Sequence, residues 1–197
     1  MVANLKNLPR HYYTLEEYFA LEKADEARYE YWDGDIVCMS GGTPKHYILS
    51  SNIHLKIGPQ LEGKKCQTFT EGVPIKTPKL PPYRYADMSV VCGESQFENM
   101  RGIYALVNPL LVVEVLSSTT EEVDKKEKRM AYQALRSLQE YLLIAQDAPL
   151  ITQYIRQGDF WVVKDYTDLA DTVELPSIQG VLSLAAVYNG VPFDLAE

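Results

Sequence analysis

Two acidic residues lie in or beside strongly apolar segments. Glu114 interrupts the aliphatic run Leu110-Leu-Val-Val-Glu-Val-Leu116, and Asp87 stands near the start of a second apolar run that ends at Cys92. Burying a carboxylate in an apolar strand is costly unless it is paired, protonated or bound to a cation. Two such acids on adjacent strands would offer the hard oxygen ligands that Mg²⁺ prefers. The pattern fits equally well a structural pair, in which Arg, Lys or backbone amides hold each acid.

A charge-dense segment, Glu121-Glu-Val-Asp-Lys-Lys-Glu-Lys-Arg129, follows Glu114 and offers basic partners. At about 100° per residue, Lys126 and Lys128 lie on opposite flanks of the apolar stripe of a predicted helix. Either ammonium can reach inward while its stem packs. A solvated face with Asp124 and Lys128 paired at i, i+4 is the alternative, and the spacing does not choose. The expected buried stripe consists of Val123, Met130, Ala134 and Leu138.

Turn and capping signals define the elements near the start of the chain. Thr14 followed three residues later by Glu17 fits a capping box, in which each side chain bonds the other residue's amide. Asp33-Gly34 between two strand-like runs is a strong hairpin signal. The elements that these signals predict are a helix over about 15–23 and strands over 28–32 and 36–39.

Apolar periodicity defines the rest of the chain. A glycine pair and then Pro44 precede mostly helical spacing, which predicts a second helix to about Leu61. A capping signal at Ser118 or Thr119 predicts a third helix to about Leu138. From Asp168 onward we expect loop, with one turn near 183–188. The predicted strands cover residues 66–71, 73–77, 86–92, 110–116, 141–145, 151–156 and 160–165.

Length and charge set limits on the class of protein. The chain has 197 residues and no linker-like segment, so a single domain over residues 1–197 is expected. Hydrophobic residues make up 46% and charged residues 23%, which is typical of a globular protein. The net charge of −8 argues against a broad basic face for sequence-independent binding of nucleic acid, although a local basic patch is compatible with it.

The cysteines and the apolar segments bear on the compartment. Cys38, Cys66 and Cys92 are far apart and form no CxxC pair, so we expect free core thiols in a reducing compartment and no thiolate zinc site. No stretch of about 18 apolar residues occurs, and the first residues lack the pattern of a secretion signal. The sequence therefore predicts a cytoplasmic protein with no membrane partner.

Six segments, in order along the chain, form a specific combination. They are Arg28-Tyr-Glu-Tyr-Trp-Asp-Gly-Asp, Met39-Ser with His46 soon after, Tyr85-Ala-Asp-Met-Ser-Val-Val, Leu111-Val-Val-Glu-Val-Leu-Ser-Ser-Thr-Thr, Asp124-Lys-Lys-Glu-Lys-Arg-Met-Ala-Tyr132 and Gln139-Glu-Tyr-Leu. The set resembles a family of restriction-endonuclease-like proteins within the PD-(D/E)XK nuclease superfamily, over about residues 13–165. The resemblance implies an α/β (α+β) restriction-endonuclease-like fold, a mixed central β-sheet flanked by helices. It also implies metal-dependent hydrolysis of phosphodiester bonds.

The resemblance assigns roles to the acids. Asp87 matches the aspartate of the superfamily signature and Glu114 matches its second acid, so both are expected to bind Mg²⁺ or Mn²⁺. Glu30 matches an acidic position of an early element and is expected to bind the metal ion or to orient another group of the site. Ala86 replaces the proline that usually precedes the aspartate, a change expected to alter only local rigidity.

The basic residue departs from the superfamily pattern. Leu116 stands where a lysine is expected two residues after Glu114, and in this family Lys128 is the matching position. The resemblance thus selects Lys128 as the catalytic lysine. Lys126 and His46 are candidate substrate contacts, although His46 could also ligate metal, cap a helix or face the core.

The function expected from the resemblance is a divalent-metal-dependent endonuclease that cleaves DNA as a homodimer. Two alternatives stay open. One is a catalytically silent module of the same fold that binds nucleic acid or protein, which the Leu116 departure makes credible. The other is a metal-dependent hydrolase of small phosphate esters, suggested by the acidic net charge.

Overall fold

The computed structural model describes residues 11–24, 28–32, 34–39, 41–78, 83–116 and 124–193. The chain divides into two units, residues 1–40 and 41–197, and each is treated on its own. The prediction of one domain over residues 1–197 stays a prediction. Among the helices of these described ranges, none is long and apolar enough to cross a lipid bilayer.

The first unit holds helix α1 (Leu15–Ala24) and a hairpin of β1 (Tyr29–Trp32) and β2 (Asp35–Cys38). The capping box is confirmed, since the Glu17 amide donates to Thr14 Oγ1 at 3.2 Å and the Thr14 amide donates to Glu17 Oε2 at 2.7 Å. The hairpin is also confirmed, and Gly34 in its turn has a φ of +92°. The other predicted turn residue, Asp33, lies outside the described residues.

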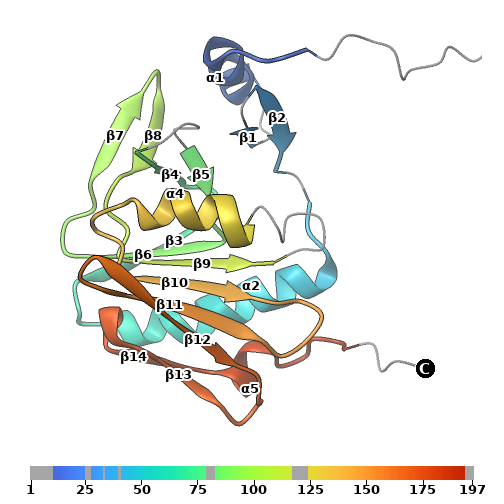
Figure 1. Cartoon of the computed structure of the whole chain (residues 1–197), viewed down its shortest axis with the longest axis vertical. Helices are drawn as coiled ribbons and strands as arrows, with labels where there is room; N and C mark the ends of the chain where they lie inside the picture. Colours follow the sequence, from blue (N-terminus) through green and yellow to red (C-terminus); the bar gives the residue numbers. More distant parts are fainter. Residues whose placement is uncertain are drawn as a thin grey trace, which may run out of the picture. The chain divides into compact units, whose positions relative to one another are not determined.

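The second unit is built on a six-stranded mixed sheet of order β12-β11-β10-β9-β6-β3 (Figure 1). Only β9 and β10 run parallel, and the other neighbours are antiparallel. The strand predictions for this sheet are confirmed within one or two residues at each end. The strands are β3 (Cys66–Thr70), β6 (Met88–Cys92), β9 (Leu111–Val115), β10 (Glu140–Ile144), β11 (Ile151–Gln157) and β12 (Phe160–Tyr166).

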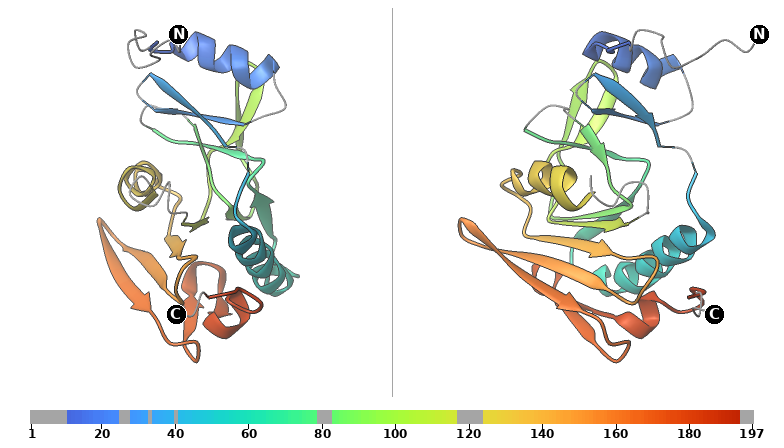
Figure 2. Two further views of the ribbon diagram at one scale, coloured as in Figure 1. Left: turned by 90° about the vertical axis from the view of Figure 1, so that its right-hand side faces the viewer. Right: turned by 45° about the vertical axis from the view of Figure 1, so that its right-hand side comes forward.

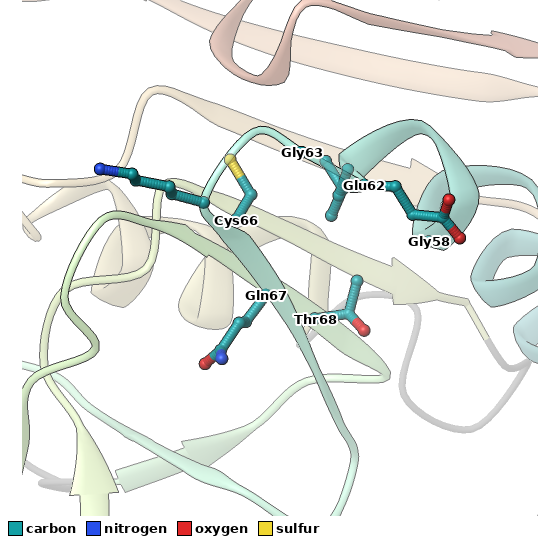
Figure 3. A pocket seen from close by; sticks show the side chains of 8 residues that line it. Gly58, Glu62, Gly63, Cys66, Gln67 and Thr68 are labelled. Atoms are coloured by element: carbon teal, nitrogen blue, oxygen red, sulfur yellow. The ribbon is translucent and has the colours of Figure 1, made fainter.

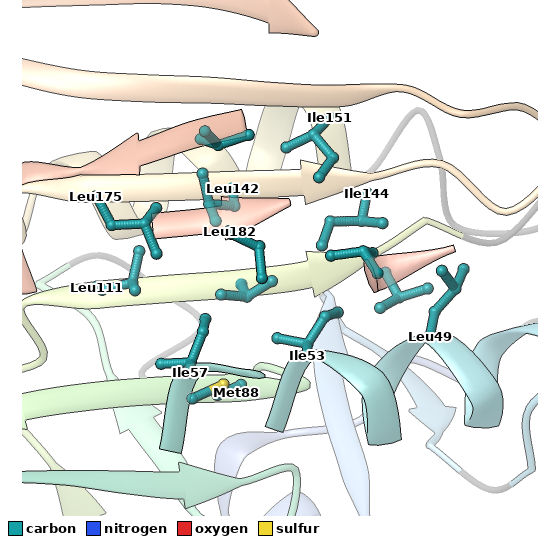
Figure 4. Packing of buried hydrophobic residues seen from close by; sticks show 14 of the residues in the cluster. Leu49, Ile53, Ile57, Met88, Leu111, Leu142, Ile144, Ile151, Leu175 and Leu182 are labelled. Carbon is teal, nitrogen blue, oxygen red and sulfur yellow. The ribbon is translucent and has the colours of Figure 1, made fainter. Parts of the chain in front are cut away.

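Helices cover both faces of this sheet. Helix α2 (Pro44–Ile57), continued by a 3₁₀ turn η2 (Gly58–Leu61), confirms the second predicted helix. Its buried residues are spaced by four and pack against the sheet (Figure 4): Leu49, Ile53 and Ile57. Figures 1 and 2 show the helix α4 (Arg129–Gln133) on the opposite side of the sheet.

Strand β9 shows how these two faces are divided. Its residues Leu111, Val113 and Val115 belong to the core under α2, whereas Val112 and the following Leu116 belong to the core under α4. Successive side chains of a strand alternate between faces. Glu114 lies two residues after Val112 and two before Leu116, so it belongs to the α4 face as they do.

The C-terminal region contradicts the loop prediction. Residues after Asp168 form a hairpin of β13 (Thr172–Leu175) and β14 (Gly180–Ser183), with a 3₁₀ turn η4 (Pro176–Ile178) between the strands. The predicted turn corresponds to the short helix α5 (Leu184–Val187). Alternate residues of this hairpin are buried against the core under α2, a pattern too short to read as a strand from sequence.

A second sheet of order β5-β4-β8-β7 completes this unit. Strand β4 was predicted within 73–77, but the other three strands were not predicted. They are short, and a proline-rich segment precedes the first of them. The strands are β4 (Pro74–Lys76), β5 (Tyr83–Tyr85), β7 (Phe97–Met100) and β8 (Ile103–Leu106).

The helix after β9 differs from its prediction in two ways. Its described part is a π-helical turn η3 (Asp124–Lys128) followed by α4, which ends at Gln133 instead of about Leu138. The predicted stripe is wrong for Met130, which is 50% exposed, and for Ala134, which is also exposed, whereas Lys128 and Tyr132 are buried. Leu138 is buried as predicted, and Val123 lies outside the described residues. A π turn holds more residues than an α turn, so an extrapolation at 100° per residue reaches the wrong face. The predicted start at Ser118 or Thr119 lies outside the described residues.

The prediction of free core cysteines is wrong for all three, because Cys66 and Cys92 are bonded to each other and Cys38 lies outside the core. Cys66 and Cys92 form a disulfide between β3 and β6, where they are directly opposite in the strand register. Cys38 is not disulfide-bonded and is exposed. The sequence did not reveal the pair because the two cysteines are 26 residues apart and meet only through the register.

Loss of this disulfide is expected to lower stability measurably. Opening the loop that it closes should reduce the free energy of unfolding by about 2–4 kcal/mol, or roughly 5–15 °C in Tm. Thermal unfolding of Cys66→Ser, and of the wild type with reductant, would measure this. Cys38→Ser is the matched control and should unfold like the wild type. Equal melting of Cys66→Ser and wild type without reductant would contradict the disulfide.

Candidate active site

Asp87 directly precedes β6, and Glu114 lies on the adjacent antiparallel strand β9. Met88 pairs with Val113 in the β6–β9 register, so one step further along the same register Asp87 stands opposite Glu114. The Val115 amide donates to Asp87 Oδ2 at 2.6 Å, which ties Asp87 to the backbone beside Glu114. The structure thus brings the two acids together, as the sequence predicted from their apolar surroundings.

The Glu114 carboxylate lies inside the protein with a buried lysine. Glu114 and Lys128 are each 3% exposed, and Lys128 Nζ lies 3.4 Å from Glu114 Oε1. The ammonium also donates to the Tyr85 carbonyl at 3.3 Å. Tyr132 donates its hydroxyl to Glu114 Oε1 at 3.0 Å. These partners meet the need of a buried carboxylate for a cation and for hydrogen bonds.

The structure distinguishes the two candidate lysines. Lys128 reaches Glu114, whereas Lys126 is exposed. The helical spacing had left this choice open, and the resemblance had selected Lys128. A role of Lys126 in contacting substrate stays a prediction.

His46 lies in the first turn of α2 and contacts Asp87. The side chain of Thr43 caps the helix by accepting from the His46 amide, which sets the position of the residue. His46 Nε2 then lies 2.9 Å from Asp87 Oδ1. Burial lowers the pKa of His46, but the hydrogen bond and charge of Asp87, with the charge of Glu71, outweigh burial and raise that pKa above its ordinary value. The sequence did not predict this contact of His46 with Asp87. The predicted role of His46 in contacting substrate stays a prediction.

The remaining predicted residue, Glu30, belongs to the first unit. It lies on β1 opposite Val37 and is 1% exposed. Its role as a further member of the site stays a prediction.

Two residues around the site were not singled out from the sequence. Glu71, directly after β3, acts electrostatically on His46. Tyr132 ends one of the segments that carry the family resemblance, but a lone tyrosine in a helix is usually core. The sequence signal for Tyr132 was its spacing of four residues from Lys128, which places the two side chains on one face of a helix. This spacing pointed to Glu114 only once Lys128 was known to face that residue.

Another buried acid of the sheet, Glu140, has a structural environment. Gln153 Nε2 donates to its Oε1 at 2.7 Å, and the Ser177 amide donates to its Oε2 at 2.8 Å. Burial raises the pKa of Glu140, and the hydrogen bonds from Ser177 and Gln153 only partly oppose this. The bond from Ser177 joins the sheet to the C-terminal hairpin. Both partners of Glu140 are neutral, whereas Glu114 is paired with a lysine.

The donor set at Asp87 and Glu114 fits a magnesium ion. Magnesium commonly takes one or two carboxylates from the protein and completes its shell with water and substrate phosphate. Within the described residues, no group of three or more His, Cys, Asp or Glu side chains is arranged to hold a metal ion. The fit therefore rests on these two carboxylates alone.

A surface pocket lies elsewhere on the same unit. It has a volume of about 580 Å³ and is lined by residues of η2, of the turn that follows it and of the start of β3, among them Glu62 of the turn and Cys66 of β3 (Figure 3). Cys66 is opposite Cys92 at the far end of β6 from Asp87. This pocket is therefore separate from the carboxylate pair.

The chain is similar to several known proteins. Residues 15–187 match the family model "Uma2: Putative restriction endonuclease". The chain is 29% identical to the uncharacterized protein slr1290 of Synechocystis sp. over 194 residues, which cover 98% of this chain and 100% of that protein. It is 28% identical to the uncharacterized protein sll1609 of the same organism, over 74% of this chain and 82% of that one.

A solved structure shares the fold. The crystal structure of "a putative nuclease belonging to DUF820" from Anabaena variabilis matches with a TM-score of 0.72, 19% sequence identity, and coverage of 91% of this chain and 99% of that one. The restriction-endonuclease-like, mixed α and β fold predicted from the sequence is thereby confirmed.

Proposed function

The chain belongs to the Uma2 family, and we propose that it is a divalent-metal-dependent endonuclease that hydrolyses phosphodiester bonds in DNA. The observation that carries this proposal is the pair of acids Asp87 and Glu114, at the start of β6 and on the adjacent β9, with Lys128 buried against Glu114. The description of the family and of the structural neighbour supports nuclease activity.

In this proposal Asp87 and Glu114 hold Mg²⁺ or Mn²⁺. When bound, the ion supplies a Lewis acid for the phosphate and lowers the pKa of a coordinated water. Lys128 places a positive charge beside Glu114, where it can stabilise negative charge that develops on the phosphate. His46 orients Asp87 through the 2.9 Å contact.

The net charge of −8 gives the proposal a further consequence. An acidic protein repels a polyanion, so affinity for DNA has to come from local positive charge. A bound divalent ion would offset the charge of the two carboxylates and face the phosphate. Productive binding of DNA should therefore depend on the metal.

Cleavage of supercoiled plasmid tests the proposal. Purified protein should nick the plasmid with Mg²⁺ or Mn²⁺ and should not do so with EDTA. A short single-stranded oligonucleotide serves as a second substrate. The matched control is the double variant Asp87→Ala/Glu114→Ala, prepared in parallel. Nicking no greater than that of the control, with both metals and both substrates, would refute the endonuclease.

The two rival functions predict no nicking of the plasmid, and each predicts a positive result in another assay. A silent module of this fold would shift the mobility of DNA without cutting it. A hydrolase of small phosphate esters would release p-nitrophenol from p-nitrophenyl phosphate or bis(p-nitrophenyl) phosphate and leave plasmid intact. A homodimer and a cytoplasmic location, both expected from the sequence, stay predictions.

A further inference from the structure

Tyr132 is a buried tyrosine whose hydroxyl has a charged partner. It is 0% exposed, and its hydroxyl donates to Glu114 Oε1 at 3.0 Å. A buried tyrosine hydroxyl needs an acceptor, and packing alone would be served by phenylalanine. The hydroxyl therefore fulfils a requirement of Glu114 rather than of the core.

The Glu114 carboxylate accepts hydrogen bonds from two residues of one helical segment. Lys128 Nζ lies 3.4 Å from Oε1 and 3.5 Å from Oε2, so the ammonium does not distinguish the two oxygens. Tyr132, four residues further along, contacts Oε1. Of these two contacts, the one from the tyrosine is the shorter and selects one oxygen of the carboxylate.

Packing holds the Tyr132 ring in place. Its centroid lies 5.6 Å from that of Tyr141 on β10, which in turn lies 6.0 Å from that of Tyr154 on β11. All three rings belong to the core under α4. A side chain whose position is fixed by such neighbours can hold a partner at low entropic cost.

From this geometry we infer that Tyr132 is a positioning residue, which fixes the orientation of the Glu114 carboxylate for the divalent ion. The inference rests on the proposed function of this site. A hydroxyl suits this task because it is neutral, so it fixes the carboxylate without adding the repulsion of a second cation. Loss of a hydrogen bond to a metal-binding side chain typically weakens the affinity for metal 10–100-fold.

Titration calorimetry with Mg²⁺ alone, without DNA, tests this inference. Tyr132→Phe should raise the Kd for Mg²⁺ roughly tenfold or more while keeping the fold. Cleavage by this variant should approach the wild-type rate as Mg²⁺ is raised to saturation. A general loss of structure would not be rescued by Mg²⁺ in this way. Tyr154→Phe is the matched control, since it removes a hydroxyl from the same row of rings, and it should bind Mg²⁺ like the wild type.

The outcomes separate this inference from the proposed function. Equal Mg²⁺ affinity of Tyr132→Phe and wild type would overturn the role of Tyr132 and leave the nuclease intact. Absence of Mg²⁺ and Mn²⁺ binding in the wild type would overturn both. Thermal unfolding reports whether each variant folds. If Tyr132→Phe does not fold, Tyr132→Met, a hydroxyl-free variant with an adaptable apolar side chain, supports or refutes the inference by the same titration.

Discussion

Replacing Glu114 with glutamine is expected to abolish detectable Mg²⁺ binding and to lower DNA cleavage roughly 1,000-fold. Glutamine keeps the shape of the side chain and an oxygen that can accept from Tyr132, but it removes the charge. A metal ion supplies several kcal/mol of stabilisation to a phosphoryl transition state, and about 1.4 kcal/mol corresponds to a factor of ten in rate. Calorimetry with Mg²⁺ and plasmid nicking measure the two effects.

This variant also disturbs a buried ion pair. Without the carboxylate, the Lys128 ammonium, 3% exposed, lacks its counter-charge, and breaking a buried pair costs about 3–5 kcal/mol. The double variant Glu114→Gln/Lys128→Met removes both charges and should recover much of that stability. It should not recover Mg²⁺ binding. Wild-type affinity for Mg²⁺ in Glu114→Gln would contradict the assignment of Glu114 as a ligand.

The acids of the site could be predicted from the sequence because burial alone makes a carboxylate conspicuous. Glu114 lies in an aliphatic run, and such a residue must find a partner wherever the strand is placed. That Asp87 would be opposite it depended on two strands being neighbours, which β6 and β9 are. The family resemblance added Lys128, which periodicity could not select.

What could not be predicted depends on local geometry and register. The π turn before α4 departs from the regular spacing of 100° per residue, and in this segment Lys128 and Tyr132 are buried whereas Met130 is exposed. The partners Cys66 and Cys92 meet only because β3 and β6 pair in one register. A capping signal such as that of Thr14, by contrast, is complete within four residues, and it was confirmed.

Replacing Lys128 with methionine is expected to separate metal binding from cleavage. Methionine keeps much of the apolar stem of lysine but removes the cation that lies 3.4 Å from Glu114. Removing a nearby positive charge should leave Mg²⁺ affinity equal to that of the wild type or higher, because the carboxylate then interacts with one cation fewer. Cleavage should nevertheless fall roughly 100–1,000-fold, the usual effect of losing one group that stabilises transition-state charge.

Lys126→Met is the matched control for this experiment, because it makes the same change of side chain two residues away, at an exposed position. It should leave cleavage near the wild-type rate and weaken DNA binding only slightly. The reverse result, with cleavage lost in Lys126→Met and kept in Lys128→Met, would show that the buried lysine only neutralises Glu114 and that the exposed one serves the reaction. Lys128→Arg keeps a positive charge at the same position, so it should retain part of the activity if the charge is what matters. The activity should be only partial because the guanidinium differs from the ammonium in shape.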